Sequence, residues 1–295
     1  MKNCICLFLS LFVLTTVLPA QNLFPQAMVP VMPETLEFAG EEVPLGNYDT
    51  RESLRRELSV TMYMHSRTLY ALLQTTRYFP VIEPILKKNG IPDDFKYLCM
   101  AESGLNPEVH SPAGAAGLWQ IMPAVGRSYG MEVGRGVDER YHVEMATEAA
   151  CRHLKESYDR LGSWTLAAAA YNLGLTGVVT RLEKQGVNDY YDAFFPDETL
   201  RYVFRILSLK LVTEHPLRYG FLIGEEDYCE PLDEYREVTV GDHKIDWAAF
   251  AREQGTNYKM LRAYNPWIRN YDSQNPAGRR YTVRIPLDGH RNGKK

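Results

Sequence analysis

The sequence predicts a mainly α-helical domain followed by a small α+β module with the order strand, helix, helix, strand. Apolar residues recur at spacings near 3.6 between about residues 50 and 215, which is the pattern of helices with one buried face. Apolar and polar residues alternate over 235–240 and 281–285, as they do in short strands. With 45% hydrophobic and 24% charged residues among 295, the composition is that of an ordinary globular protein.

The first twenty residues are typical of an export signal. Lys2 precedes an apolar stretch from Ile5 to Leu18, and Pro19 and Ala20 provide a small-residue cleavage site. The stretch is shorter than the roughly 20 residues that a membrane-spanning helix needs. We therefore expect a cleaved signal peptide over 1–20, with a retained anchor as the alternative. Residues 21–50, rich in Pro and acidic side chains, are expected to form an irregular lead-in.

Helices are expected throughout residues 51–215. The first carries Leu54, Leu58 and Met62 on one face and ends, or gives way to the next, at Phe79-Pro80. A later helix opens at residues 92–94 and stops near Gly104. The remaining helical segments are Val81–Lys88, Ala146–Leu161, Leu166–Tyr171 and Leu200–Leu211.

A linker over 216–234 is expected to lead into the module of residues 235–290. The module begins with a strand at 235–240 and ends with a strand at 281–285. Two helices are predicted between them, over Ile245–Gln254 and Tyr258–Tyr264, and they end at Gly255 and at Asn265-Pro266.

Charge and cysteine content exclude several functions. Lys and Arg number 33 against 37 Asp and Glu, so the net charge is -4 and a nucleic-acid partner is not expected. Cys99, Cys151 and Cys229 follow the signal segment, and an odd number leaves at least one thiol free. We expect Cys99 and Cys151 to be buried as small apolar residues. No CxxC or HExxH pattern occurs, so we expect neither a metal site nor a cofactor.

The side chains best suited to catalysis and ligand binding lie within residues 101–123. Glu102 ends a helix whose other side chains are apolar, and loss of solvation raises a carboxyl pKa, as a general acid requires. A stretch of small residues over 113–117 lets backbone approach a ligand closely. Trp119, Gln120 and Met122 then supply a flat apolar face, an amide and a flexible apolar contact, a set that suits a sugar. A solvated or helix-capping glutamate is the alternative interpretation of Glu102.

Several separated motifs occur in the order found in the lytic murein transglycosylases, a lysozyme-like family that also includes the goose-type lysozymes. They are AESGLNP, SPAGAAGLWQIMP, VDERY with ATEAACRHL, WTLAAAAYNLG and ETLRYVFRIL. Residues 50–215 thus resemble the catalytic domain of this family. The resemblance implies a lysozyme-like helical domain that cleaves the β-1,4 bond between N-acetylmuramic acid and N-acetylglucosamine and leaves 1,6-anhydromuramic ends.

The resemblance also implies roles for individual residues. Glu102 matches the single catalytic acid and base, and the hydroxyl of Tyr171 is expected to hydrogen-bond its carboxyl group. Core packing is the alternative for Tyr171 and Tyr202, and interaction with a helix N-terminus is the alternative for Glu198. The substrate-binding residues implied by the motifs are Ser111, Gln120, Met122, Tyr171, Asn172, Glu198 and Tyr202.

Two other functions compete with transglycosylation. A hydrolytic muramidase on the same fold is expected to place a water-activating Asp after the glutamate, yet only Glu108 and Glu132 are acidic between Glu102 and Asp138. The third possibility is a peptidoglycan-binding protein without activity. In each case the expected partner is the peptidoglycan glycan strand, bound by a monomer with peripheral envelope association.

Residues 235–290 resemble a diverged LysM module, a small glycan binder often joined to these enzymes. The Val238–Gly241 start and the Asn265-Pro266 turn after the second helix support the resemblance, whereas His243-Lys244 after Asp242 departs from the usual Thr-Leu. Glycan binding and a purely structural or interaction role are both open. Trp247 and Trp267 are candidate sugar platforms, with buried packing as the alternative for each.

Overall fold

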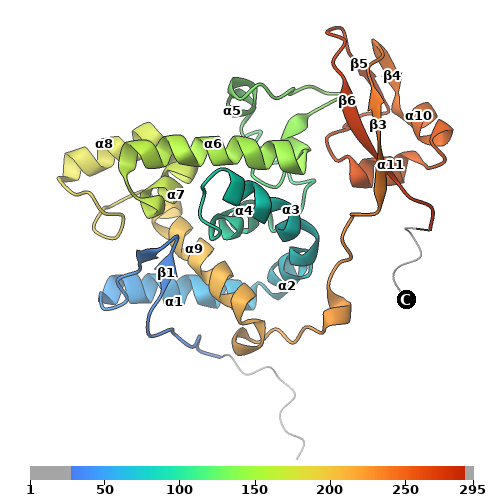
Figure 1. Cartoon of the computed structure of the whole chain (residues 1–295). Coiled ribbons are helices and arrows are strands. Elements are labelled where there is room, and N and C mark those ends of the chain that lie inside the picture. The colour runs from blue at the N-terminus through green and yellow to red at the C-terminus, as the bar shows by residue number, and fades with distance from the viewer. Residues whose placement is uncertain (1–27, 290–295) are drawn as a thin grey trace, which may run out of the picture.

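A computed structural model describes residues 28–289, so the predicted signal peptide lies outside the described residues. Within this range, helices α1 to α9 form one body, and strands β3 to β6 with helices α10 and α11 form a second beside it (Figure 1). The predicted fold class, a mainly α-helical domain followed by a small α+β module, is confirmed.

The lead-in contains a short hairpin that the sequence did not predict. Strands β1 (Glu37–Phe38) and β2 (Glu41–Glu42) pair antiparallel around Ala39 and Gly40, whose φ angles are 55° and 80°. Two residues with positive φ form the tight turn that suits paired strands. Phe38 is fully buried and its ring lies 5.3 Å from that of Phe95, so this arm is part of the core.

The first predicted helix is divided into three. Helices α1 (Tyr48–Tyr63), α2 (His65–Leu73) and α3 (Thr75–Lys88) are separated at single residues. The prediction that Pro80 marks a helix boundary is wrong, because Pro80 and Pro84 both lie inside α3. The two prolines are four residues apart and exposed, so they share the outer face of the helix while its inner face stays packed in the core.

The remaining helices follow the predicted order. Helix α4 (Phe95–Ser103) ends at Gly104, where the prediction placed its end, and Gly104 has a left-handed φ of 61°. Helix α9 (Asp197–Glu214) packs against α1, α4 and α7 (Trp164–Leu173), which brings together three segments that are far apart in the sequence (Figure 1). The other helices of this body are α5 (Pro123–Ser128), α6 (Val143–Leu161) and α8 (Leu175–Gln185).

The C-terminal module has the predicted element order and one additional strand pair. Strand β3 (Tyr235–Val240) pairs antiparallel with β6 (Tyr281–Pro286), and α10 (Trp247–Glu253) and α11 (Tyr258–Tyr264) lie between them in the chain. Strands β4 (Lys244–Asp246) and β5 (Asp272–Gln274) also pair, but three residues are too few for a recognisable alternation.

The two tryptophans proposed as sugar platforms are both buried, so that interpretation is wrong. Trp247 is fully buried and donates its indole hydrogen to Ser273 Oγ at 2.7 Å. Trp267 is 4% exposed and stacks on Tyr281. Both rings belong to the core of the module, because their large apolar surface is better removed from water there.

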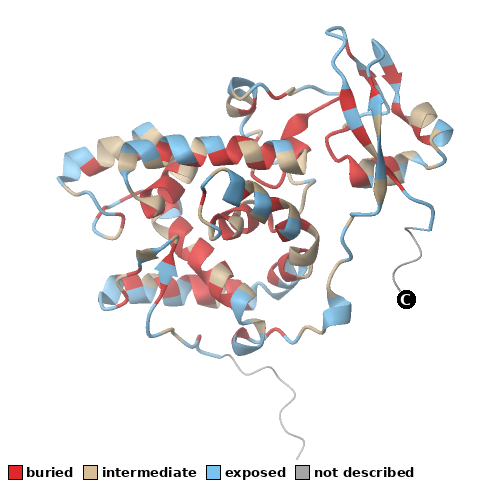
Figure 2. Ribbon diagram, viewed as in Figure 1, coloured by how far each residue is buried: buried red, intermediate tan, exposed pale blue. Residues whose placement is uncertain are grey.

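Buried residues occur in both bodies (Figure 2). The buried apolar residues form two clusters, and the second crosses between the two bodies. The first joins helices α1 to α9 with the N-terminal arm. The second contains the module core, but it also includes Ala116, Val137 and Tyr141 from the helical body. The module is therefore packed against the helical body through apolar surface.

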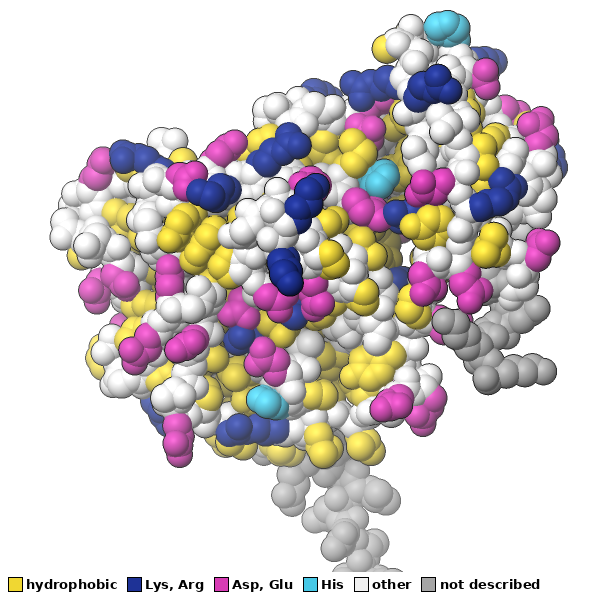
Figure 3. All heavy atoms as spheres, in the orientation of Figure 1, with side chains coloured by type: hydrophobic (Ala, Val, Ile, Leu, Met, Phe, Trp, Pro, Cys, Tyr) yellow, Lys and Arg dark blue, Asp and Glu magenta, His cyan; other side chains and the backbone are white. Residues whose placement is uncertain are grey.

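Charges of both signs are interspersed over the face shown in Figure 3, without one large basic patch. Cys99 and Cys151 are buried, as predicted, and neither they nor Cys229 forms a disulfide in the described part of the chain. Among residues 28–289, no helix combines the length and the apolar character needed to cross a membrane. The same residues contain no group of three or more potential metal-binding His, Cys, Asp or Glu side chains.

Candidate active site

Glu102 lies in the last turn of α4, on a helix whose neighbouring side chains are almost all buried. Its own side chain is only partly exposed. The hydroxyl of Tyr202, on α9, donates a hydrogen bond to Glu102 Oε1. The packing of α4 against α9 therefore joins two residues that lie a hundred positions apart in the sequence.

The environment of Glu102 favours the neutral acid. Burial raises its pKa from 4.5 to about 7, because a carboxylate loses more solvation than a carboxylic acid does. The hydrogen bond from Tyr202 and the nearby charges of Arg205 and Arg67 oppose this shift, whereas the charge of Glu198 adds to it. Glu102 can thus both donate and accept a proton near neutral pH, as the sequence analysis predicted.

Tyr171 does not make the hydrogen bond that the resemblance implied. Its hydroxyl donates to the backbone carbonyl of Trp119 at 2.8 Å, and Tyr202 takes the predicted place beside Glu102. The pKa of Tyr171 is nevertheless raised, first by burial and then by the charge of Glu102, so the two side chains are close enough to interact electrostatically. The difference arises because Tyr171 is on α7 and is held by its contact with the loop before α5.

Residues 108–122 form a loop that holds most of the motif SPAGAAGLWQIMP, and we call it the substrate loop after that resemblance. It is held in shape by its own hydrogen bonds. Ser111 Oγ accepts from the backbone N–H of Ala115 at 3.0 Å, closing the small-residue turn. Gln120 has a φ of 47° and donates its amide to the carbonyls of Val109 and Gly117 at 3.1 and 2.8 Å. Ser111 and Gln120 therefore shape the loop in addition to any contact with substrate.

Gln120, Met122 and Tyr171 line one pocket of about 60 Å³. Met122 is 42% exposed, as an adaptable contact with a ligand would be. Trp119, in contrast, is fully buried and donates its indole hydrogen to Thr147 Oγ1 at 2.8 Å. The expectation that Trp119 offers a flat surface to a sugar is therefore wrong, because the ring is part of the core.

Asn172 and Glu198 connect the ends of helices α7 and α9. Asn172 Oδ1 accepts a hydrogen bond from Thr199 Oγ1 at 2.8 Å. Glu198 lies in the first turn of α9, where a carboxylate is favoured, and pairs with Arg205 at 2.9 Å. Its pKa is lowered by the hydrogen bond from Arg205, so it stays ionised at neutral pH.

The sequence analysis assigned no role to two positively charged side chains close to Glu102, or to a third that holds the substrate loop. Arg205 and Arg67 line a second pocket of about 60 Å³, together with Ala101 and Gly104, which flank Glu102 closely in the chain. The spacing of three residues between Tyr202 and Arg205 places both on the same side of α9, and this signal was available in the sequence.

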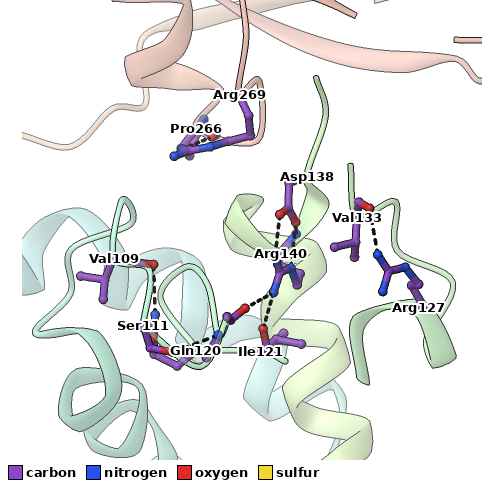
Figure 4. Close-up of polar contacts among 12 residues, drawn as sticks. Val109, Ser111, Gln120, Ile121, Arg127, Val133, Asp138, Arg140, Pro266 and Arg269 are labelled. Carbon is purple, nitrogen blue, oxygen red and sulfur yellow. Dashed lines mark hydrogen bonds and ion pairs between the residues drawn. The ribbon is translucent and has the colours of Figure 1, made fainter. Parts of the chain in front are cut away.

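Arg140 is the third of these side chains, and it anchors the substrate loop (Figure 4). It is 4% exposed, and its Nη1 donates to the carbonyls of Gly114 and Ile121 at 2.7 and 2.9 Å. Asp138, also buried, binds the guanidinium through both carboxylate oxygens at 2.7 and 3.0 Å. A planar guanidinium is suited to such a forked arrangement, which fixes the position of the donor.

The two acidic residues between Glu102 and Asp138 contact the C-terminal module. Glu108 pairs with Arg262 and Arg269 at 2.9 and 2.8 Å. Glu132 accepts a hydrogen bond from the hydroxyl of Tyr281 at 2.8 Å. Both carboxylates are thus engaged by other groups.

Comparison with known proteins assigns both bodies to described domain families. Residues 79–194 match the model of the transglycosylase SLT domain, and residues 236–289 match the soluble lytic transglycosylase C-terminal LysM-like domain. The chain therefore carries an SLT transglycosylase domain followed by a LysM-like domain, which confirms both resemblances noted in the sequence.

Among curated proteins, the chain is 29% identical over 242 residues to membrane-bound lytic murein transglycosylase D from Escherichia coli (strain K12). The match covers 79% of this chain and 51% of that protein, so the chain spans about half the length of the relative.

Two solved structures are also similar. The 70 kDa soluble lytic transglycosylase SLT70 from Escherichia coli matches with a TM-score of 0.43 and 20% identity, over 65% of this chain and 33% of that one. An inactive mutant of lytic transglycosylase Slt from Pseudomonas aeruginosa matches with a TM-score of 0.37 and 20% identity, over 50% of this chain and 26% of that one.

Proposed function

We propose that this protein is a peptidoglycan lytic transglycosylase. It cleaves the β-1,4 bond between N-acetylmuramic acid and N-acetylglucosamine and leaves 1,6-anhydromuramic ends during cell wall turnover. The observation that carries the proposal is the carboxyl group of Glu102 within an SLT domain, whose pKa burial raises to about 7, so that the protonated acid is well populated near neutral pH.

In the first step, Glu102 gives its proton to the glycosidic oxygen and the bond from that oxygen to C1 of the muramic acid breaks. Because Oε1 accepts the hydrogen bond from Tyr202, we assign the transferable proton to Oε2. The hydrogen bond that Tyr202 donates also stabilises the carboxylate that forms. Protonation of the leaving oxygen is the role that a raised pKa suits.

In the second step, the Glu102 carboxylate takes the proton of the C6 hydroxyl while that oxygen bonds to C1. The products are a 1,6-anhydro sugar and a free hydroxyl on the other fragment, no water is consumed, and Glu102 ends protonated. A glycosidase that uses water ordinarily needs a second carboxylate. Here the substrate supplies its own nucleophile, which agrees with the engagement of Glu108 and Glu132 by the module.

For substrate binding, we propose that Gln120, Met122 and Tyr171 contact the sugar through the pocket that they share. Ser111 is proposed to contribute from the loop. Asn172, Glu198 and Tyr202 are proposed to line the cleft from α7 and α9.

The proposed site of action is the periplasm or cell envelope, reached through the signal peptide of residues 1–20. We propose that the protein acts there as a monomer with peripheral envelope association, on glycan strands. The catalytic domain is proposed to occupy residues 51–215 and the LysM-like module residues 235–290.

Product analysis tests this function directly. Purified peptidoglycan digested by the full chain should yield fragments with 1,6-anhydromuramic ends, and digestion in oxygen-18 water should leave those ends unlabelled. Labelled reducing ends instead would establish a hydrolytic muramidase. Specific binding to the same peptidoglycan without any released fragment would establish a binding protein that lacks activity.

A further inference from the structure

The contacts of the C-terminal module reach the loop that forms the proposed active site. We propose that the LysM-like module is a brace that holds the substrate loop of the catalytic domain in its working conformation, in addition to any contact that it makes with glycan. This inference concerns the role of the module and rests on the proposed function only for its activity measurements.

The first contact is made by backbone groups. Residues 136–138 pair with 267–269: Asp138 N–H donates to the carbonyl of Trp267 at 2.9 Å, and Arg269 N–H donates to that of Gly136 at 2.8 Å. The approach is close, because a Cβ atom on Gly136 would lie 2.6 Å from Ser273 Oγ. The module therefore fixes the backbone at the point from which Asp138 extends.

Asp138 connects this fixed backbone to the substrate loop. Its carboxylate holds the guanidinium of Arg140, which in turn holds the carbonyls of Gly114 and Ile121 (Figure 4). The loop also lies directly on this segment, since a Cβ atom on Gly117 would be only 2.1 Å from the carbonyl oxygen of Arg140. Groups packed this closely cannot shift independently.

A second contact holds the start of the loop. Glu108 receives hydrogen bonds from both Arg262 and Arg269 of the module. The guanidinium of Arg269 also lies 3.7 Å from the centre of the Tyr141 ring, a cation–π contact with the helical body. The module thus binds the loop directly at Glu108. It also holds the middle of the loop indirectly, through Asp138 and Arg140.

Apolar packing completes the contact. Ala116, in the centre of the substrate loop, is fully buried and belongs to the same cluster as Trp247 and Ile268 of the module. His142 stacks on Trp267 with ring centres 6.1 Å apart. The surface that seats the module is therefore continuous with the inner side of the substrate loop, which is the arrangement that a brace requires.

The test compares two glycine variants of the full chain. In Gly136→Ala the added methyl group meets Ser273, so the module must move. In the control, Gly241→Ala, the nearest atom would lie at 3.5 Å, an ordinary contact. The first measurement is hydrogen exchange of the backbone amides of residues 109–121. The second is the rate of cleavage, both of short soluble glycan fragments and of whole peptidoglycan.

We expect Gly136→Ala to speed amide exchange in the substrate loop by about tenfold and to lower kcat/KM on both substrates by a similar factor. Gly241→Ala should change neither. A loss confined to whole peptidoglycan, with unchanged exchange in the loop, would overturn the brace and leave the module as a glycan binder. Because exchange does not depend on activity, it decides the question even if the proposed reaction fails.

A charge-reversal series tests the same proposal if the Gly136→Ala variant misfolds. Arg262→Glu with Arg269→Glu should loosen the loop, and adding Glu108→Arg should partly restore slow exchange because opposite charges again face each other. Lys259→Glu, on the exposed side of the same helix as Arg262, is the matched control. Absence of any restoration in the triple variant would count against the contact at Glu108.

Discussion

Replacement of Glu102 by Gln is expected to lower the rate of peptidoglycan cleavage by about a thousandfold, the scale on which general acid–base catalysis contributes. Gln is close in shape and can still accept the hydrogen bond from Tyr202, but it cannot give or take the proton. The rate of release of anhydromuramic fragments is the measurement. A variant that retains the original rate would show that Glu102 is not the acid.

The same variant should be more stable than the natural protein above neutral pH. The pKa of Glu102 is raised from 4.5 to about 7 in the folded state, so the folded protein binds this proton more tightly than the unfolded chain does. Natural stability therefore falls as pH rises through this range, by roughly 3–4 kcal/mol in total. Glutamine does not titrate, so urea unfolding should show the variant's advantage at pH 8 and little difference at pH 4.

Replacement of Arg140 by Met should have the second large effect. It leaves the buried Asp138 carboxylate without its partner, and removing one member of a buried ion pair costs about 3–5 kcal/mol. It also removes the two hydrogen bonds to the carbonyls of Gly114 and Ile121. Urea unfolding should show the lost stability, and unchanged stability would contradict the anchoring role.

The conservative variant Arg140→Lys separates positioning from folding. Lysine keeps the charge but lacks the planar fork, so the loop should remain folded yet be less well placed. We expect kcat/KM to fall by about 10- to 100-fold, mainly through KM, with the pH dependence of kcat unchanged because Arg140 does not set the pKa of Glu102. A shifted pH profile with constant KM would exclude this role.

The elements that could be predicted from sequence are those specified by local pattern. Glu102 and the end of α4 at Gly104 follow from short-range signals, and the structure places both as expected. The hairpin at Ala39-Gly40 was missed because its turn lacks the usual Asn-Gly or Asp-Gly pair. Pro80 was misassigned because tertiary packing of the inner face of α3 outweighed the local cost of proline.

The unpredicted features depend on packing between distant segments. The family resemblance placed Tyr171 and Tyr202 in the same region, but the rotation of α7 and α9 decides which hydroxyl reaches Glu102. Trp119 was misjudged because an aromatic ring suits a buried core as well as a sugar surface. The pairing of Glu108 with Arg262 joins positions 154 residues apart, and no spacing rule reveals it.

Titration of the Glu102 side chain tests the central claim most directly. Carbon NMR of protein labelled at the glutamate carboxyl groups, with the resonance assigned by its loss in Glu102→Gln, should give a pKa of about 7. In Tyr202→Phe, which removes a hydrogen bond that favours the carboxylate, the pKa should move higher still. A value near the ordinary 4.5 in the natural protein would contradict the account, because Glu102 would then have no proton to donate at neutral pH.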